Sequence, residues 1–326
     1  MPSSDSPPPA VLCAGILVAD LFVPPLAGLP AEGALVATED FLVDSGGCAA
    51  NTATCLVKLG VPTAVAGKVG QDIFGDFVAR DMTGKGVETS AISRSATHGT
   101  SKTVILPVIG QDRRYIHTFG ANADFQGADL PATLLDTARV FCLGGYLVLP
   151  QLNPADLRAA MRRARQHGAL TVLDVVVPAG DPGKSLAAVE AVLPEVDYFL
   201  PNDTEARALT GEADPEAQAR RLLQAGCRSV IITLGERGAL LVNQHQTLEA
   251  PAPKVEVVDG SGAGDAFAAG LIVGLLEGWD AARALQFASV IGASACTRLG
   301  TTAGVLTRPQ AEAYLKEYPL PVEERS

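Results

Sequence analysis

Short apolar runs alternate with longer amphipathic stretches along most of this chain. Residues 11–18, 63–70 and 140–145 are apolar runs that predict buried strands, and residues 48–60 and 73–86 predict helices between them. This alternation is typical of βαβ units, in which helices connect parallel strands. A mostly parallel sheet is therefore expected from about Val11 onward.

The second half of the chain repeats the pattern. Residues 153–168 predict a helix with Asn153 as N-cap, Pro154 as the first helical residue and Gly168 as the stop. Because the strands are apolar throughout, helices should cover both faces of the sheet. The remaining elements are expected as strands at 170–177, 197–201 and 229–235, helices at 184–194 and 202–211, a hairpin-like pair at 238–243 and 247–251, and further helices to about Leu299.

Two stretches break the pattern. Residues 33–44 and 100–120 alternate polar and apolar positions without helical spacing, which predicts half-exposed antiparallel strands. We expect a small sheet that projects from the main body as a lid, with strands from about residues 16–44 and 100–120. The polar, proline-rich residues 1–10 predict a disordered tail, so one structured domain is expected over residues 11–326.

The composition narrows the class of protein. The 326 residues are 48% hydrophobic and 19% charged, which is enough apolar material for a packed core. With 25 Lys and Arg against 36 Asp and Glu, the net charge is −11, and the chain lacks the cationic surface that nucleic acids require. No apolar run approaches the roughly 20 residues that span a bilayer. The six scattered cysteines predict free thiols in a reducing compartment, so a cytoplasmic protein is expected.

The strongest chemical signal is VDGSGAGDAFAAG, between Val258 and Gly270, where a predicted strand leads into an apolar helix. Backbone N–H groups at such a helix start attract anions such as phosphate. Asp265 would repel a stored phosphate, but it could accept a proton from a hydroxyl that attacks the phosphate. The alternative is a helix start built on a tight glycine turn. A Walker A loop and a dinucleotide fingerprint both fail on spacing.

This motif is part of a wider resemblance. DGSGAGDAF resembles the C-terminal signature of the ribokinase (PfkB) family of sugar and nucleoside kinases, and SGGCAANTATCLVKLG, from Ser45 to Gly60, resembles its N-terminal signature. The resemblance spans nearly the whole chain and implies a three-layer αβα sandwich with a mostly parallel central sheet and a small β-sheet lid. Shorter matching stretches are Gly67–Gly75, Asn202–Glu205, Thr233–Gly238 and Thr297–Gly300.

For the reacting groups, the resemblance implies a catalytic base and an anion hole for the transferring phosphoryl group. These would be formed by Asp265 as base and by Gly262, Ala263 and Gly264. An ionised carboxylate only accepts hydrogen bonds, which suits the recognition of a polyol. Asp20, at the end of the first predicted strand, fits that role or that of an exposed acid. The substrate-binding residues implied are Asp20, Gly46, Gly47 and Asn51.

The resemblance also implies ATP and Mg²⁺ as cofactors. Glu205 would help to place Mg²⁺ through water, although Asn202 and Glu205 also fit a capping box, and both roles can hold. Gly260 replaces the family's usual Thr beside an implied potassium site. The nucleotide-binding residues implied are Asn202, Thr233, Gly235, Gly238 and Ser261. The implied monovalent-cation site consists of Asp259, Arg298 and Gly300.

The function implied is ATP-dependent transfer of the γ-phosphoryl group to a hydroxyl of a sugar or sugar derivative, in a homodimer joined through the lid. Cys48 stands where ribokinases carry a Lys, so strict ribose specificity is not expected. Arg113 and Arg114 would contact an acidic substrate group or be solvated. One alternative is a nucleoside kinase, with stacking surfaces from Phe41, Phe119 and Phe125; another is a catalytically silent relative that binds sugar or nucleotide.

Overall fold

A ten-stranded main sheet forms the centre of the molecule, with strand order β14-β13-β12-β11-β10-β9-β8-β1-β4-β5. The computed structural model describes residues 8–111, 114–178, 180 and 182–325, so most of the predicted tail lies outside the described residues. The seven neighbouring strands β11, β10, β9, β8, β1, β4 and β5 pair in parallel, and β12, β13 and β14 add an antiparallel edge. The strands are β1 Val11–Gly15, β4 Thr63–Val69, β5 Glu88–Arg94, β8 Val140–Tyr146, β9 Leu170–Val175, β10 Tyr198–Leu200, β11 Ser229–Thr233, β12 Ala239–Asn243, β13 Thr247–Ala250 and β14 Glu323–Glu324.

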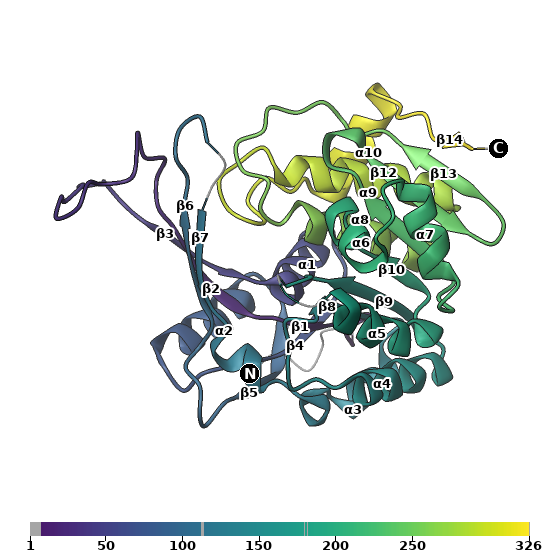
Figure 1. Cartoon of the computed structure of the whole chain (residues 1–326), viewed down its shortest axis with the longest axis horizontal. Helices are drawn as coiled ribbons and strands as arrows, with labels where there is room; N and C mark the ends of the chain where they lie inside the picture. Colours follow the sequence, from purple (N-terminus) through teal and green to yellow (C-terminus); the bar gives the residue numbers. More distant parts are fainter. Residues whose placement is uncertain (1–7, 112–113, 179, 181, 326) are drawn as a thin grey trace.

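Helices cover both faces of this sheet, which makes three layers (Figure 1). One face carries α1 Cys48–Lys58, α2 Ile73–Gly84, α8 Ala263–Glu277, α9 Ala281–Ala295 and α10 Arg308–Glu317. The other carries α3 Ala132–Thr137, α4 Pro154–Gln166, α5 Pro182–Val192, α6 Asp203–Thr210 and α7 Pro215–Leu223. Short 3-10 turns occupy Gly120–Asp124, Gly127–Asp129, Leu193–Glu195 and Gly235–Arg237.

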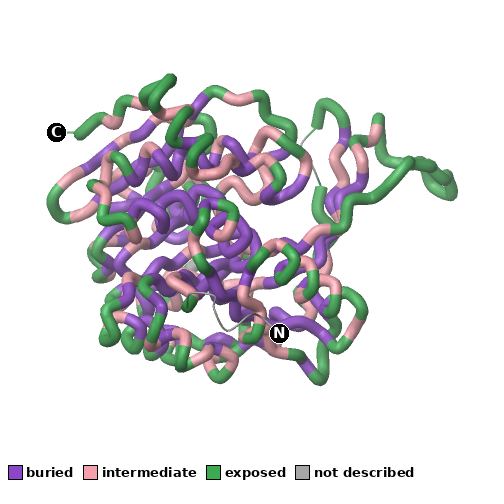
Figure 2. The backbone as a smooth tube through the Cα atoms, turned by 180° about the vertical axis from the view of Figure 1, so that it is seen from behind, coloured by how far each residue is buried: buried purple, intermediate pink, exposed green. Residues whose placement is uncertain are grey.

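Two hydrophobic cores lie between the layers because successive strand residues point to opposite faces. On β1, Val11 and Cys13 belong to one core, whereas Leu12 and Ala14 belong to the other. All four side chains are fully buried, as the continuous apolar runs predict. Figure 2 shows this buried centre surrounded by half-buried and exposed helices. The expected sandwich is confirmed.

Local signals also place individual helices correctly. Helix α4 begins at Pro154, and the Asn153 side chain accepts a hydrogen bond from the Asp156 backbone N–H, as an N-cap does. Gly168 follows the helix with a φ of 89°, a left-handed conformation that favours glycine. No helix within the described residues is both long and apolar enough to cross a membrane.

A second, four-stranded sheet, hereafter the lid, projects from the main body with the order β3-β2-β6-β7 (Figure 1). Its strands are β2 Val18–Phe22, β3 Leu42–Gly46, β6 Lys102–Leu106 and β7 Arg114–Thr118. The lid is confirmed, with two corrections. Residues 33–41 form no strand. Strands β2 and β6 pair in parallel, because each follows the end of a parallel strand of the main sheet, β1 and β5 respectively.

Ion pairs and a buried amide hold the lid to the main body. The ammonium of Lys85, the residue after α2, contacts the Asp44 carboxylate on β3 and lies 2.7 Å from the Asp81 carboxylate on α2. The buried Asn122 side chain accepts a hydrogen bond from the Leu17 N–H at 3.1 Å and donates one to the Leu17 carbonyl at 2.9 Å. Leu17 lies between β1 and β2, so these contacts fix the angle at which the chain enters the lid.

Candidate active site

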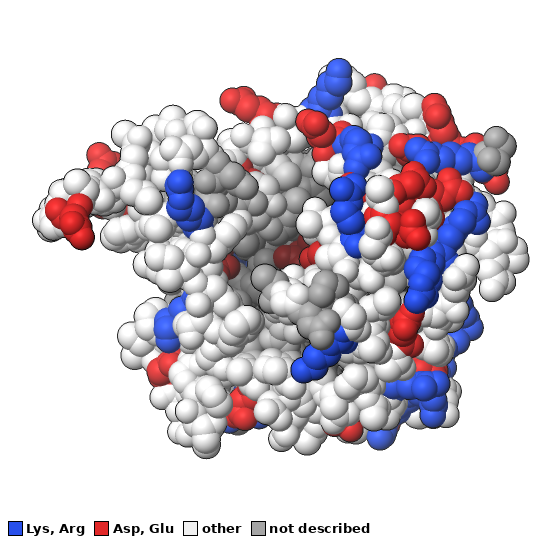
Figure 3. All heavy atoms as spheres, in the orientation of Figure 1, with Lys and Arg blue, Asp and Glu red and all other residues white. Residues whose placement is uncertain are grey.

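The predicted site residues gather at the carboxyl ends of the parallel strands, where open α/β sheets bind their ligands. A cavity there is lined by side chains from α1, β9 and the starts of α6 and α8. A neighbouring pocket shares Thr233, Ala263, Gly264 and Phe267 with it, so the two form one continuous site. Figure 3 shows the hollow between the lid and the main body, with acidic side chains on its floor.

The start of α8 is a tight glycine turn, in which the Ala263 N–H donates a hydrogen bond to the Gly260 carbonyl at 3.4 Å. Gly262, the N-cap, has a φ of 77°, and no side chain caps the helix. A Cβ at Gly262 would lie 2.2 Å from the Thr301 carbonyl oxygen, so only glycine fits there. The uncapped N–H groups and the helix dipole favour an anion at this position. The glycine turn is therefore required by the local packing, and an anion-binding role for it stays a prediction.

Asp265 lies in the first turn of α8, beside that anion site. Its Oδ2 accepts a hydrogen bond from the Asn51 side-chain amide at 2.8 Å, which joins the two predicted signatures although 214 positions separate them. Burial raises the pKa of Asp265 to about 6, opposed by hydrogen bonds from Asn51 and Cys48. A carboxylate with a pKa near neutrality and a fixed orientation is suited to accept a proton.

The structure corrects the position of Asp20, which lies on lid strand β2 and not at the end of the first strand. Gly46, its neighbour on β3, leaves room for the side chain: a Cβ there would lie 1.8 Å from the Asp20 Oδ2. Burial raises the pKa of Asp20 to about 7, and a hydrogen bond from Thr103 opposes the shift. Asp20 is only 6% exposed, which rules out the alternative of a solvated loop acid.

Asn202 and Glu205 form a complete capping box at the start of α6. The Glu205 N–H donates to the Asn202 side chain at 2.8 Å, and the Asn202 N–H donates to the Glu205 carboxylate at 2.9 Å. Both residues also line the cavity that holds Asp265. Burial raises the pKa of Glu205 to about 7. The structural role is confirmed, and the position of the carboxylate also leaves it available to a cation.

The neighbouring pocket is mostly apolar and lies beside the turn after β11. Thr233, Gly235 and Gly238 line it together with Phe267 of α8. At Gly238 a Cβ would lie 1.9 Å from the Ala250 carbonyl oxygen, so the backbone approaches closely here. A flat apolar group would fit against such glycine backbone. Ser261 lies in the turn before α8, and its buried hydroxyl has no hydrogen-bond partner among the described residues.

The three residues predicted to bind a monovalent cation come together only in part. Oxygens of the Asp259 carboxylate accept hydrogen bonds from the Ser261 N–H at 2.9 Å and from the Gly300 N–H at 3.2 Å. Asp259 is buried, whereas the Arg298 side chain is exposed. Asp259 therefore joins the two loops behind the anion site.

Sequence reasoning missed two groups of the site, Asp174 and the Cys48 thiol. Asp174 lies near the carboxyl end of β9 and lines the cavity with Cys48 and Asp265. Its signal was a single carboxylate within the apolar run LTVLDVVV. An acid in a buried strand requires a partner or a function. The sequence shows Cys48 only as a residue that stands where ribokinases carry a Lys, with no sign that its thiol would face two carboxylates.

The structure also places the other side chains that were candidates for contact with a substrate. The Arg114 guanidinium donates to the Gln111 side chain at 2.7 Å on the exposed face of the lid, which favours the solvated alternative, and Arg113 lies outside the described residues. Phe125 is fully buried and cannot stack on a nucleobase. Phe41 and Phe119 are exposed on or near the lid.

The sandwich, its lid and the acid beside a glycine-lined helix start define a kinase-like phosphoryl-transfer site. The description "pfkB family carbohydrate kinase" matches residues 9–308, so the chain belongs to this family. It is an ATP-dependent phosphotransferase that acts on a sugar hydroxyl.

Individual proteins are also similar to this chain in sequence or in fold. The deoxyribokinase of Salmonella typhi is 28% identical over 294 residues, which is 88% of this chain and 92% of that relative. Ribokinase of Arabidopsis thaliana, solved with ribose and ATP, has a TM-score of 0.79 at 24% identity and covers 94% of this chain and 99% of its own. A candidate ribokinase II from E. coli, solved with ATP and Mg²⁺, has a TM-score of 0.79 at 22% identity and covers 95% of this chain and 100% of its own.

Proposed function

We propose that Asp265 is the general base that accepts the proton of a sugar hydroxyl while the γ-phosphoryl group of ATP is transferred to the hydroxyl oxygen. The observation that carries this proposal is the position of the Asp265 carboxylate, held by Asn51 beside the uncapped start of α8. In the transfer, the bond between the γ-phosphorus and its bridging oxygen breaks, and ADP leaves. The N–H groups of residues 262–264 would stabilise the charge on the moving group.

The sugar would be held between the main body and the lid. The buried Asp20 carboxylate would accept hydrogen bonds from neighbouring sugar hydroxyls, with Gly46, Gly47 and Asn51 around it. The lid would close over the sugar and exclude water, which would otherwise compete for the phosphoryl group. A sugar or sugar derivative with free neighbouring hydroxyls is the substrate class that this arrangement fits.

The cofactors proposed are ATP and Mg²⁺. The apolar pocket at Thr233, Gly235 and Gly238 would take the base of ATP, with Asn202 near the phosphates and the unpartnered Ser261 hydroxyl offering them a donor. Glu205 would hold Mg²⁺ through water; this carboxylate lines a cavity whose described lining contains no Lys or Arg. Mg²⁺ supplies neutralisation of the β- and γ-phosphate oxygens.

Three further properties are part of the proposal. Potassium would bind at the loops around Asp259, Arg298 and Gly300. Gly260 lacks the hydroxyl of the Thr that the family usually carries at this position. The chain would form a homodimer through the lid, whose exposed apolar residues include Val43 and Ile116. None of the six cysteines, which all lie within the described residues, forms a disulfide, and this fits a reducing, cytoplasmic environment.

The test is ADP release from Mg·ATP, with and without potassium, across hexoses, pentoses, sugar acids, sugar phosphates and nucleosides. Turnover with one sugar class is expected and would name the substrate. Turnover with nucleosides alone would favour the nucleoside kinase alternative. Protein that binds ATP in a thermal-shift assay but turns over no member of the panel would support the catalytically silent alternative.

A further inference from the structure

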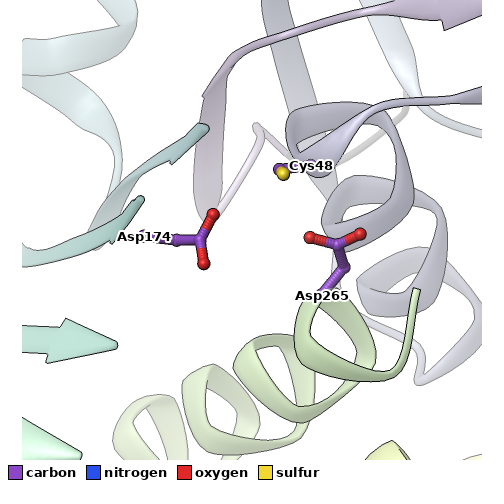
Figure 4. Close-up of side chains that lie close together, drawn as sticks. All are labelled: Cys48, Asp174 and Asp265. Atoms are coloured by element: carbon purple, nitrogen blue, oxygen red, sulfur yellow. The ribbon is translucent and has the colours of Figure 1, made fainter. Parts of the chain in front are cut away.

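A thiol and two carboxylates converge beside the phosphoryl-transfer site. The Cys48 Sγ, an Asp174 carboxylate oxygen and an Asp265 carboxylate oxygen all lie within 4.8 Å of one another. Figure 4 shows the three side chains, which come from the first turn of α1, from β9 and from the first turn of α8. All three elements belong to the main body and none to the lid.

The surroundings of this cluster also favour a cation. The cavity that contains the three side chains is lined by a third carboxylate, Glu205, and by no Lys or Arg among its described residues. The Asp174, Asp265 and Glu205 carboxylates therefore share one cavity. A bound cation would relieve both the desolvation and the mutual repulsion of these acids.

We propose that Cys48, Asp174 and Asp265 form a site for a soft divalent cation of the zinc type, and that binding there blocks the base. Thiolate ligands select zinc-like ions, whereas Mg²⁺ prefers oxygen ligands alone. With Zn–S near 2.3 Å and Zn–O near 2.0–2.2 Å, a tetrahedral ion holds its ligand atoms roughly 3.5 Å apart. Small side-chain rotations would close the present cluster to that spacing, with water as the fourth ligand.

Metal binding exchanges the thiol proton for the metal ion and involves no oxidation or reduction. The Cys48 thiol loses its proton to solvent as the sulfur–metal bond forms, and each carboxylate donates an oxygen lone pair. The Asp265 oxygen held by the metal can no longer accept a hydroxyl proton. The expected inhibition therefore rests on the proposed role of Asp265, whereas the metal binding itself does not.

The experiment uses the full chain, free of metal and nucleotide, with Co²⁺ as a spectroscopic substitute for Zn²⁺. A thiolate-to-cobalt charge-transfer absorption is expected at one ion per chain, and Zn²⁺ should displace it. Cys48→Ser should lose this absorption and weaken Zn²⁺ binding by about 10-fold or more, as measured by calorimetry. Cys227→Ser, at a buried thiol on the other side of the sheet, is the matched control and should keep both.

Three results would overturn the site: no charge-transfer absorption, an absorption that persists in Cys48→Ser, or equal Zn²⁺ affinity in the two proteins. Cys48→Ala replaces Cys48→Ser if the latter fails to fold. The kinetic part measures inhibition of ADP formation by Zn²⁺, which should require about 10-fold more Zn²⁺ in Cys48→Ser. Metal binding without inhibition would support the site and count against Asp265 as base.

Discussion

At the scale of single residues, the clearest test concerns the Asp265 carboxylate. Asp265→Asn preserves size and can still bond to Asn51, but an amide does not accept the hydroxyl proton. We expect kcat to fall by about 10²- to 10⁴-fold while ATP affinity, measured by calorimetry, is unchanged. Asp136→Asn, at a surface acid paired with Arg163, is the control and should retain full activity. Full activity in Asp265→Asn would remove this residue from the role of base.

The pKa values of the two buried acids predict how activity depends on pH. Burial raises the pKa of Asp265 to about 6 and that of Asp20 to about 7. Only the ionised Asp265 can accept a proton, and only the ionised Asp20 can accept hydrogen bonds on both oxygens without itself being a donor. Acidification through this range should therefore lower kcat/KM. A pH–rate profile tests this, and Asp20→Asn should remove the upper ionisation. A profile that stays flat down to about pH 5 would contradict the assignment.

The same ionisation of Asp20 acts on stability with the opposite sign. Because the folded protein holds this proton more tightly than the unfolded chain, the stabilisation is complete below the unfolded pKa of 3.8 and is lost as pH rises through about 7. The conditions that activate the site thus reduce the stability of the apo protein.

Gly46 is expected to affect sugar binding, because the absence of a side chain there leaves room for the Asp20 carboxylate. In Gly46→Ala, the new Cβ would lie 1.8 Å from the Asp20 Oδ2 and displace the carboxylate. Misplacement by an ångström can cost on the order of 10²-fold in kcat/KM for the sugar, with ATP affinity unchanged. Gly84→Ala, where a Cβ meets nothing within 4 Å, is the matched control. Equal kinetics in the two variants would show that Asp20 does not set sugar binding.

At the scale of elements, helix α6 combines a structural and a chemical role in one carboxylate. Glu205→Gln keeps an oxygen that can accept the Asn202 N–H but removes the charge. We expect unchanged Tm and a higher Mg²⁺ concentration for half-maximal activity. Asn202→Ala removes the side chain that accepts the Glu205 N–H at the helix start. It should lower the free energy of unfolding by about 0.5–2 kcal/mol. Mg²⁺ dependence that is the same in Glu205→Gln and the parent would leave Glu205 with the capping role alone.

The position of the lid depends on a few contacts with the main body. Its outer edge strand β3 is tied to α2 through Lys85, which lies between two carboxylates. The entry to β2 is fixed by Asn122, more than 100 positions away along the chain. These contacts hold Asp20 over the site, although none of them touches the cavity.

At the scale of the whole molecule, the proposed homodimer would be joined through one face of the lid. The strand pairing places Leu21, Val43, Val104 and Ile116 in one row across its four strands, on the face opposite Asp20. Val43 is 40% exposed and Ile116 is 64% exposed. A contiguous apolar row of this kind is typical of an interface.

The prediction is a homodimer that a charge in this row disrupts. Ile116→Lys should shift the mass in light scattering from dimer to monomer at micromolar concentration, because an unpaired charge at an apolar interface is costly. Val257→Lys introduces the same charge at an equally exposed position of the main body and should leave the mass unchanged. A monomeric parent protein would exclude this dimer.

Much of the fold follows from the sequence because its signals act over a few residues. Several helix starts depend on residues two to four positions apart. Examples are the N-cap at Asn153, the capping box at Asn202 and the glycine turn before α8. The alternation of strands and helices likewise reflects burial on both faces of each strand. These local patterns determined the layers, the parallel sheet and the glycine turn at the start of α8.

Other features were decided by the tertiary structure. Residues 33–41 alternate like a strand but form none, and the start of β2 after β1 could not be separated from one longer apolar run. The approach of Asn51 to Asp265, and of Cys48 to Asp174, depends on the strand order and on how α1 packs beside α8. Sequence spacing carries no record of such distances, because the residues meet only after the sheet and its helices have assembled.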